Sequence, residues 1–296
     1  MGVIAAMVLA AGFGTRLRPL TDNCAKALVP VGDRPALAHV LDELTAAGIT
    51  RLAVNAHHRA NDVRAFVDGL GVRIEVSEEA DLLGTAGGLA KAAPMLGPGD
   101  VLVWNGDILA RIELPRLIDS HSFSNAEATL VVEKRSPGEG PVGTDEEGRI
   151  VRLRTLRSGA EAHGGEFLGV SVVGRALRDR LPERGCLVAD AWMPALRRGA
   201  QLRAFFHEGP WRDIGTIASY LAANLDWLDT RRLAHWAGDG ATIVPDVSLD
   251  RSIVGRGAVA EGRGALVRCV VWPGARASAP LRAAVVTDTR IVHVAE

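Results

Sequence analysis

The stretch VIAAMVLAAGFGTRLRPL at positions 3–20 decides how the rest of the chain is interpreted. It begins with an apolar run and passes directly into a loop that contains Gly12 and Gly14. An apolar run bounded by glycines is typical of a buried parallel strand. The loop also brings Arg16 and Arg18 beside the flexible backbone. Because glycines let backbone N–H groups approach an anion and arginines add fixed positive charge, the stretch predicts a strand followed by a polyphosphate-binding loop.

Apolar strand-like runs alternate with helix-like stretches through the first half of the chain. Apolar residues also recur on one helical face between Pro35 and Gly48. This alternation predicts βαβ units, and therefore an α/β fold with a Rossmann-like, mixed but mostly parallel sheet. The strand-like runs lie at 3–10, 51–55, 72–76 and 101–105.

The second half of the chain carries weaker signals. Further strands are expected near 128–133 and 167–173, and the pattern at 216–229 predicts a helix. The stretch 136–166 is rich in glycine and charge, which is typical of a mobile or ligand-facing excursion.

After about residue 237 the apolar residues repeat every six positions. Val254, Ala260 and Leu266 form one such series, and Val247, Ile253 and Val259 belong to another. Six is not a helical period, so the pattern predicts a short C-terminal left-handed parallel β-helix, with an irregular β-meander as the alternative. We therefore expect a catalytic domain at 1–235 and a hexapeptide-repeat appendage at 236–296.

Composition restricts the kinds of partner. With 296 residues, 48% hydrophobic and 23% charged, the chain is long enough for a large core. The net charge of −1 and the scattered arginines give no footprint for nucleic acid. No apolar run approaches the roughly 20 residues that span a bilayer, so we expect no membrane partner, no export and a cytoplasmic location. Cys24, Cys186 and Cys269 have no metal-ligand spacing, which fits a reducing compartment.

Two common phosphate loops do not fit the opening stretch. The dinucleotide fingerprint needs a third glycine where Leu17 stands, and the P-loop needs a lysine directly after its second glycine. Taken alone, the loop is either a polyphosphate site or a tight turn with solvated arginines.

A series of motifs narrows this choice. LAAGFGTRLRPLT at 9–21 is followed by KALVPV at 26–31, LLGTAGGL at 82–89, VWNGDIL at 103–109 and WRDIGT at 211–216. In this order the motifs resemble the sugar-1-phosphate nucleotidylyltransferases, also called NDP-sugar pyrophosphorylases. The resemblance covers nearly the whole chain and implies a GT-A-like catalytic domain, often followed by a β-helix.

The resemblance implies a magnesium-dependent reaction between a nucleoside triphosphate and a sugar-1-phosphate, which gives an NDP-sugar and pyrophosphate. It assigns catalysis to Arg16, Lys26, Asp107 and Asp213, and magnesium to the two aspartates. It assigns the sugar phosphate to Asp107, Gly140, Glu166 and Gly169. It assigns the nucleotide to Leu9, Ala11, Gly12, Gly14, Thr15, Arg16, Lys26, Glu79, Gly84, Thr85 and Gly87.

The chain departs from the family at two places. Ala25 stands where members usually have proline, and no Glu-Lys-Pro run precedes the strand FLGVSVV. The partner of the sugar phosphate is therefore Arg154, Arg157 or Lys134. With these two departures, the sequence resembles the mannose-1-phosphate guanylyltransferase and N-acetylmuramate-1-phosphate uridylyltransferase branches of the family. Guanylyl transfer to a mannose-like sugar is favoured. Uridylyl or thymidylyl transfer, or a non-catalytic NDP-sugar-binding regulatory protein, is the alternative, and a homo-oligomer through the C-terminal region is possible for each.

Overall fold

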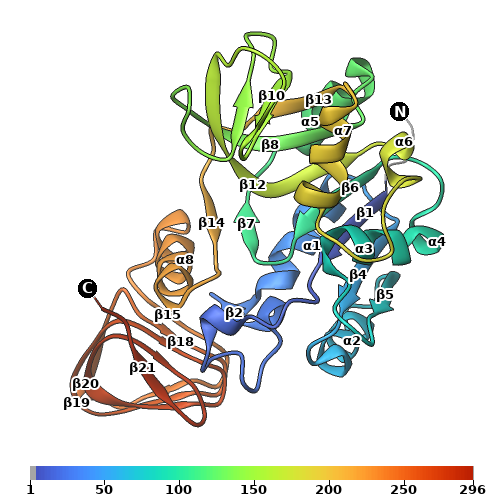
Figure 1. Cartoon of the computed structure of the whole chain (residues 1–296). Helices are drawn as coiled ribbons and strands as arrows, with labels where there is room; N and C mark the ends of the chain where they lie inside the picture. The colour runs from blue at the N-terminus through green and yellow to red at the C-terminus, as the bar shows by residue number, and fades with distance from the viewer. Residues whose placement is uncertain (1–4, 296) are drawn as a thin grey trace. The chain divides into compact units, whose positions relative to one another are not determined.

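A computed structural model describes residues 5–295, and the contacts within it divide the chain into two units (Figure 1). Unit 1 comprises the described part of Met1–Gly12 together with Val40–Trp211. Unit 2 comprises Phe13–His39 and the described part of Arg212–Glu296. The division expected from the sequence, at residue 235, stays a prediction, and positions 3 and 4 of the first predicted strand lie outside the described residues.

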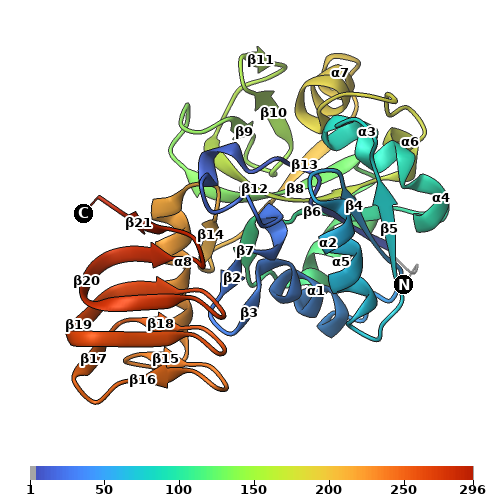
Figure 2. The same ribbon diagram turned by 90° about the horizontal axis from the view of Figure 1, so that it is seen from below.

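Unit 1 is built on a ten-stranded mixed sheet. Its parallel part confirms the α/β fold expected from the sequence, and the strand expected at 101–105 has those bounds. The parallel strands, in spatial order, are β5 (Ile74–Glu78), β4 (Leu52–Ala56), β1 (Ala5–Leu9) and β6 (Val101–Asn105). The central strands β1, β4 and β6 are almost fully apolar because helices cover both faces, and Figure 2 shows α2 and α3 on opposite faces, whereas β5 carries Glu75 and Glu78.

The rest of this sheet is mainly antiparallel. The long strand β12 (His163–Val173) pairs antiparallel with β6, β8 and β9, and β13 pairs parallel with β8. The glycine- and charge-rich stretch 136–166 therefore folds mainly as short antiparallel strands, which its composition does not indicate: β9 (Val142–Thr144), β10 (Ile150–Leu153) and β11 (Leu156–Arg157). The flanking strands of this part of the sheet are β8 (Ala128–Arg135), at the place of the strand expected near 128–133, and β13 (Leu202–Phe206).

Helices and one short strand complete unit 1. Its core contains the buried side chains of Met7, Val103, Leu130 and Trp192. The helix expected between Pro35 and Gly48 is α1 (Ala36–Ala46), which crosses from unit 2 into unit 1. The remaining elements are α2 (Ala60–Asp68), α3 (Gly84–Lys91), α4 (Ala93–Leu96), β7 (Ile108–Ala110), α5 (Leu114–Ser124), α6 (Arg175–Arg178), the π-helical turn η3 (Leu187–Trp192) and α7 (Met193–Arg197).

Unit 2 joins an early segment to the C-terminal part of the chain. Helix α8 (Ile217–Thr230) confirms the helix expected at 216–229, and Thr216 begins it with a capping box shared with Ser219. The early segment contains η1 (Thr15–Leu17), η2 (Lys26–Leu28), β2 (Pro30–Val31) and β3 (Arg34–Pro35). The later strands are β14 (Trp211–Asp213), β15 (Trp236–Ala237), β16 (Thr242–Ile243), β17 (Val247–Asp250), β18 (Ile253–Val254), β19 (Val259–Val271), β20 (Arg276–Val286) and β21 (Ile291–His293).

Most of the C-terminal strands pair in parallel at a regular offset. Trp236 pairs with Ile253 and Thr242 with Val259, 17 positions apart, and a register shift within β19 changes the offset to 15 from Leu266 onward. Val254, Ala260 and Leu266, one of the six-residue series, are buried together in this sheet. Figure 2 shows the strands stacked as successive turns of chain. The arrangement is consistent with a parallel β-helix, and its left hand stays a prediction.

Candidate functional site

A buried polar network lies at the carboxyl ends of the parallel strands in unit 1. Asn55, the last polar residue of β4, accepts a hydrogen bond from the Ala10 N–H through Oδ1 at 2.7 Å. Its Nδ2 donates to Glu79 Oε1 at 2.7 Å, and Glu79 Oε2 accepts the Leu83 N–H at 2.9 Å. Both oxygens of the buried Glu79 therefore have partners, and the network ties three strand ends to the start of α3. This is the edge where open α/β sheets bind ligands.

The glycine-rich run GTAGG forms the first turn of α3. A Cβ on Gly87 would lie 2.5 Å from the carbonyl oxygen of Glu183, and a Cβ on Gly84 would lie 2.4 Å from that of Gly185. The Leu187 N–H donates to Thr85 Oγ1 at 2.8 Å. These glycines therefore let the loop before η3 pack directly on the helix, and their contact with a nucleobase stays a prediction.

Asp107 lies at the same edge of the sheet, just after β6. The neighbouring Gly106 N–H donates to the carbonyl oxygen of Leu9 at 2.9 Å. Gly169 has a φ of +75°, and a Cβ there would lie 2.7 Å from Asn105 Nδ2. Leu9 on β1 and Gly169 on β12 therefore both lie against the turn at Asn105 and Gly106 that leads into Asp107.

A buried ion pair organises the loop that carries Gly140. Arg152 Nε and Nη2 donate to the two carboxylate oxygens of Glu161 at 2.7 and 2.8 Å, and the Gly138 N–H donates to the same group at 2.8 Å. Arg152 Nη1 also donates to the carbonyl oxygen of Gly140 at 2.8 Å. The hydrogen bonds from Arg152 lower the pKa of Glu161 from 4.5 to about 2. The pair therefore fixes the loop from inside the protein, with both side chains almost fully shielded from solvent.

Gly140 is brought against the strand that carries Glu166. Its φ is +68°, and a Cβ there would lie 2.2 Å from the carbonyl oxygen of Gly165 and 3.2 Å from the Glu166 N. Only glycine fits this approach without displacing backbone. Two of the residues expected to bind the sugar phosphate are therefore neighbours.

The three cationic candidates for the sugar phosphate differ in their surroundings. Lys134 places its ammonium 5.6 Å from the centre of the Phe206 ring, and Arg157 lies 3.4 Å from Glu161. Arg154 is exposed, has a φ of +54°, and its N–H donates to the carbonyl oxygen of Pro141 at 2.7 Å. Within residues 5–295 its guanidinium has no hydrogen bond or ion pair, unlike that of Arg157.

The basic segment of unit 2 folds around Gly14. This glycine has a φ of +64°, and a Cβ there would lie 2.9 Å from Thr21 Cγ2 and 3.0 Å from Lys26 Cβ. Thr21 Oγ1 also donates to the carbonyl oxygen of Gly14 at 2.8 Å. The glycine loop and the lysine of KALVPV, which are twelve positions apart, are thereby brought into contact.

Arg16 and Asp213 meet at Gly215. A Cβ on Gly215 would lie 2.7 Å from Asp213 Oδ1 and 2.8 Å from Arg16 Nη2. In the described part of the chain, Asp213 Oδ1 is buried and accepts no hydrogen bond. A buried carboxylate oxygen needs a hydrogen-bond donor or a cation as its partner, so Asp213 Oδ1 is suited to be a metal ligand. Asp107 belongs to unit 1 and Asp213 to unit 2, and their sharing of one magnesium ion stays a prediction.

The described residues contain no cluster of three or more His, Cys, Asp or Glu side chains arranged for a metal ion. Magnesium needs no such cluster, because it usually keeps several waters and takes one or two carboxylates with substrate phosphates. Cys24, Cys186 and Cys269 form no disulfide in the described structure. No helix among residues 5–295 is long and apolar enough to cross a membrane.

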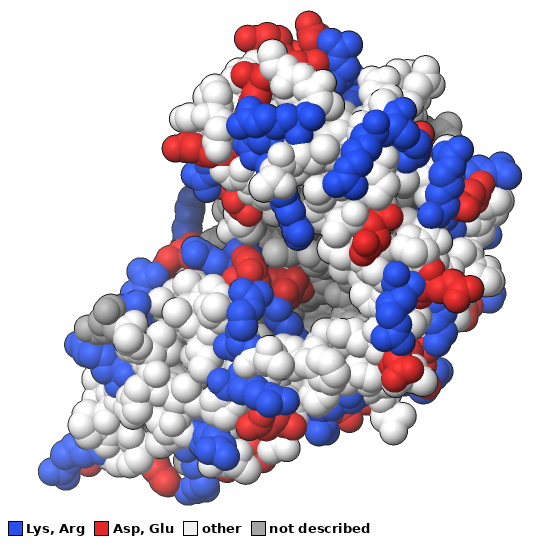
Figure 3. Space-filling view, viewed as in Figure 1, with Lys and Arg blue, Asp and Glu red and all other residues white. Residues whose placement is uncertain are grey.

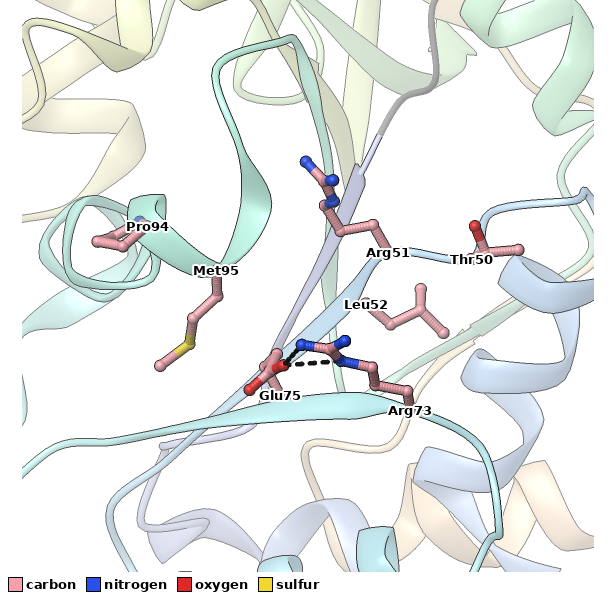
Figure 4. Close-up of a pocket in the computed structure, with 7 residues that line it drawn as sticks. All are labelled: Thr50, Arg51, Leu52, Arg73, Glu75, Pro94 and Met95. Carbon is pink, nitrogen blue, oxygen red and sulfur yellow. Dashed lines mark hydrogen bonds and ion pairs between the residues drawn. The ribbon is translucent and has the colours of Figure 1, made fainter.

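A cavity of about 600 Å³ lies at the opposite end of the strands (Figure 4). Thr50, Arg51 and Leu52 line it at the start of β4, and Arg73 in its wall is paired with Glu75 at 3.0 Å. It is therefore distinct from the strand edge that carries Asn55. Figure 3 shows acidic and basic side chains interspersed over the visible face, and the absence of a nucleic-acid partner stays a prediction.

Sequence reasoning missed Asn55, Arg152 and Glu161. Asn55 ends the apolar run RLAVN, and a polar residue at the end of a buried strand is a signal that could have been used. The ion pair has no local signal, because its members are nine positions apart on different sides of a hairpin.

A mixed α/β sheet with glycine loops and carboxylates at its strand ends is the arrangement expected of a nucleotidyltransferase, and the fold is shared with solved structures of that class. Residues 5–230 match the Nucleotidyl transferase family, and the chain belongs to this family. The resemblance seen in the sequence is thereby confirmed, and the protein is a nucleotidyltransferase.

Relatives and solved structures agree with this assignment. The chain is 33% identical to the mannose-1-phosphate guanylyltransferase of Mycobacterium tuberculosis over 93% of its own length and 81% of that protein. It is 30% identical to probable mannose-1-phosphate guanylyltransferase 3 of Oryza sativa, over 92% of this chain and 82% of the other. The crystal structure of HddC from Yersinia pseudotuberculosis, complexed with GMP-PN, has the same fold, with a TM-score of 0.64 and 19% identity over 76% of this chain and 99% of that one.

Proposed function

We propose that the protein transfers a guanylyl group from GTP to mannose-1-phosphate and releases pyrophosphate. The observation that carries the chemistry is the meeting of Arg16 with Asp213 Oδ1 at Gly215; this oxygen is buried and accepts no hydrogen bond from residues 5–295, so the place is suited to a phosphate and its cation. The guanine donor and the mannose acceptor are favoured by the relative that is 33% identical over 93% of the chain.

In the proposed reaction an oxygen of the sugar phosphate attacks the α-phosphorus of GTP. The new P–O bond forms as the bond from the α-phosphorus to the bridging oxygen breaks, and pyrophosphate leaves. Catalysis of this kind depends mostly on alignment and charge neutralisation. Arg16 binds the β- and γ-phosphates, and Lys26 stabilises the charge that develops during transfer. Asp107 and Asp213 would hold Mg²⁺, which supplies further neutralisation of the phosphate charge when bound.

The remaining residues bind the two substrates. Arg154 takes the phosphate of the sugar, because it is the candidate cation without a side-chain partner in the described structure. Gly140, Glu166 and Gly169 bind the sugar. The nucleoside contacts Leu9, Ala11, Gly12, Gly14, Thr15, Glu79, Gly84, Thr85 and Gly87.

The test is a matrix of pyrophosphate-release assays with magnesium. GTP, UTP, dTTP and ATP are each combined with mannose-, glucose-, N-acetylglucosamine- and N-acetylmuramate-1-phosphate, and the product is identified by mass spectrometry. We expect the highest kcat/KM for GTP with mannose-1-phosphate. A higher value for UTP or dTTP would replace the donor assignment. Thermal stabilisation by GDP-mannose without any turnover would instead identify a regulatory binding protein.

We place this reaction in the cytoplasm, where free thiols stay reduced. The C-terminal strands, beyond residue 236, are the proposed contact between copies of the chain. Size-exclusion chromatography with light scattering, on the full chain and on a chain ending before residue 237, tests the oligomer.

A further inference from the structure

Side chains of helix α8 form hydrogen bonds with the backbone at Pro30 and Gly32, just after the basic residues Arg16 and Lys26. Tyr220 Oη donates to the carbonyl oxygen of Pro30 at 2.5 Å, and Asn224 Oδ1 accepts the Gly32 N–H at 2.9 Å. Both side chains belong to fully buried residues, with 0% exposure. A Cβ on Gly32 would lie 2.0 Å from the Trp227 ring, so the turn after KALVPV lies flat on the helix. Three consecutive turns of α8 thus hold this part of the backbone.

The other end of the basic segment reaches the start of the same helix. Arg16 lies against Gly215, directly before the N-cap residue Thr216, and the capping box fixes that turn. Lys26 is held between these two points through its contact with Gly14. The segment that carries Arg16 and Lys26, the two cations assigned to the triphosphate, is therefore held at both ends by α8 and the turn before it.

Helix α8 is fixed in turn by the C-terminal sheet. Trp272 Nε1 donates to Tyr220 Oη at 3.0 Å, and the two rings are T-shaped with centres 6.5 Å apart. The Tyr220 hydroxyl therefore accepts a hydrogen bond from Trp272 and donates its single proton to the carbonyl oxygen of Pro30. Burial raises the pKa of Tyr220 far above its ordinary value, so the hydroxyl stays protonated and remains a donor.

We propose that Tyr220, supported by Trp272 of the C-terminal sheet, is a positioning residue for the triphosphate-binding segment from Gly14 to Val31. The inference rests on the proposed function, and it gives the C-terminal strands a role in nucleotide binding in addition to stability. Removing the hydroxyl leaves the Pro30 carbonyl and the Trp272 N–H without partners in a buried place, so the segment shifts to recover them. Small displacements of groups that align phosphates are costly in rate.

The experiment compares Tyr220→Phe and Trp272→Phe with a matched control in the same unit. Ser252 is fully buried in the C-terminal sheet, where its hydroxyl donates to the carbonyl oxygen of Leu266 and accepts the Cys269 N–H, each at 2.9 Å. Ser252→Ala therefore weakens the sheet without touching Tyr220. Two readouts are used: steady-state kinetics with GTP and mannose-1-phosphate, and hydrogen exchange of peptides from 13–31, which needs no activity.

For Tyr220→Phe we expect a rise of about tenfold in the KM for GTP, with the KM for mannose-1-phosphate within about twofold of wild type. Amides in 13–31 should exchange faster, and Trp272→Phe should show a smaller change of the same kind. Ser252→Ala should lower the melting temperature and leave both readouts of the segment as in wild type.

Unchanged exchange in 13–31 for Tyr220→Phe would overturn the proposal, as would the same loosening in Ser252→Ala, which would make the effect one of general stability. A wild-type enzyme without turnover on any donor and acceptor would refute the proposed function instead. The exchange data would then still decide whether Tyr220 positions the segment.

Discussion

Replacing Glu161 by glutamine should make the protein less stable at neutral pH and no less stable in acid. The carboxylate accepts two hydrogen bonds from Arg152 and one from the Gly138 N–H, and its side chain is 4% exposed. Glutamine keeps the shape but turns an NH₂ group toward the guanidinium. Arg152 would then be a buried charge without its partner.

The size of the effect follows from the pKa of Glu161, which the Arg152 hydrogen bonds lower from 4.5 to about 2. At about 1.4 kcal/mol for each pKa unit, this shift is equivalent to about 3 kcal/mol. Solvent near the surface loop screens part of it, so we expect a loss of about 1–2 kcal/mol at pH 7. Because the folded pKa is the lower one, the stabilisation is complete above pH 4.5 and is lost as the pH falls toward 2.

The assay is thermal unfolding of wild type and Glu161→Gln between pH 7 and pH 2. The difference in melting temperature should be constant down to about pH 5 and should shrink below it. Glu147→Gln is the matched control, since Glu147 pairs with Arg149 in the same part of the chain but is 64% exposed. It should change stability by less than about 0.5 kcal/mol at every pH. A difference for Glu161→Gln that is equal at pH 7 and pH 2 would refute the linkage.

Three further predictions concern the predicted site residues. Arg16→Ala and Lys26→Ala should fold normally and lose about 2–4 kcal/mol of transition-state stabilisation; near wild-type kcat/KM in both would remove the triphosphate assignment. Asp107→Asn and Asp213→Asn should need more magnesium for half-maximal rate, and wild-type magnesium dependence in either would mark that residue as structural. Gly87→Ala places a methyl group 2.5 Å from a backbone carbonyl, so it should cost about 1–3 kcal/mol in thermal unfolding; an unchanged melting temperature would mean that the facing loop adjusts freely.

The parallel part of the fold could be predicted from the sequence because its signals are local. Strands β1, β4 and β6 are nearly continuous apolar runs, and a strand buried on both faces needs no other pattern. The region 136–166 was not predictable in the same way. Its strands β9 to β11 are only two to four residues long, too short to show a periodic pattern, and they pair with one another and with β12.

In the candidate site, too, residues in local motifs could be predicted from the sequence, and their distant partners could not. Arg16 and Lys26 stand in contiguous motifs, so their chemistry can be inferred without a structure. The partners that hold the loops cannot, because they come from distant parts of the chain. Asn55 meets Glu79 across two strands, and Tyr220 meets Pro30 across 190 positions. Glu79 also has a structural role that its motif does not reveal, because its two carboxylate oxygens accept hydrogen bonds from Asn55 and from the start of α3. Its contact with the base stays a prediction.

The segment from Phe13 to His39 has little regular structure of its own, since it contains only two 3₁₀ turns, a two-residue hairpin and the start of α1. Ordering such a segment costs about 1–2 kcal/mol per residue in conformational entropy, so its backbone groups must find partners elsewhere. Buried side chains of α8 supply those partners, and Trp272 supports one of them from the C-terminal sheet. Arg16 in GTRLRPL and Lys26 in KALVPV therefore depend for their position on residues that no local motif reveals. We therefore expect that a chain of this family with an intact glycine and arginine signature loses activity when the partners supplied by α8 are removed.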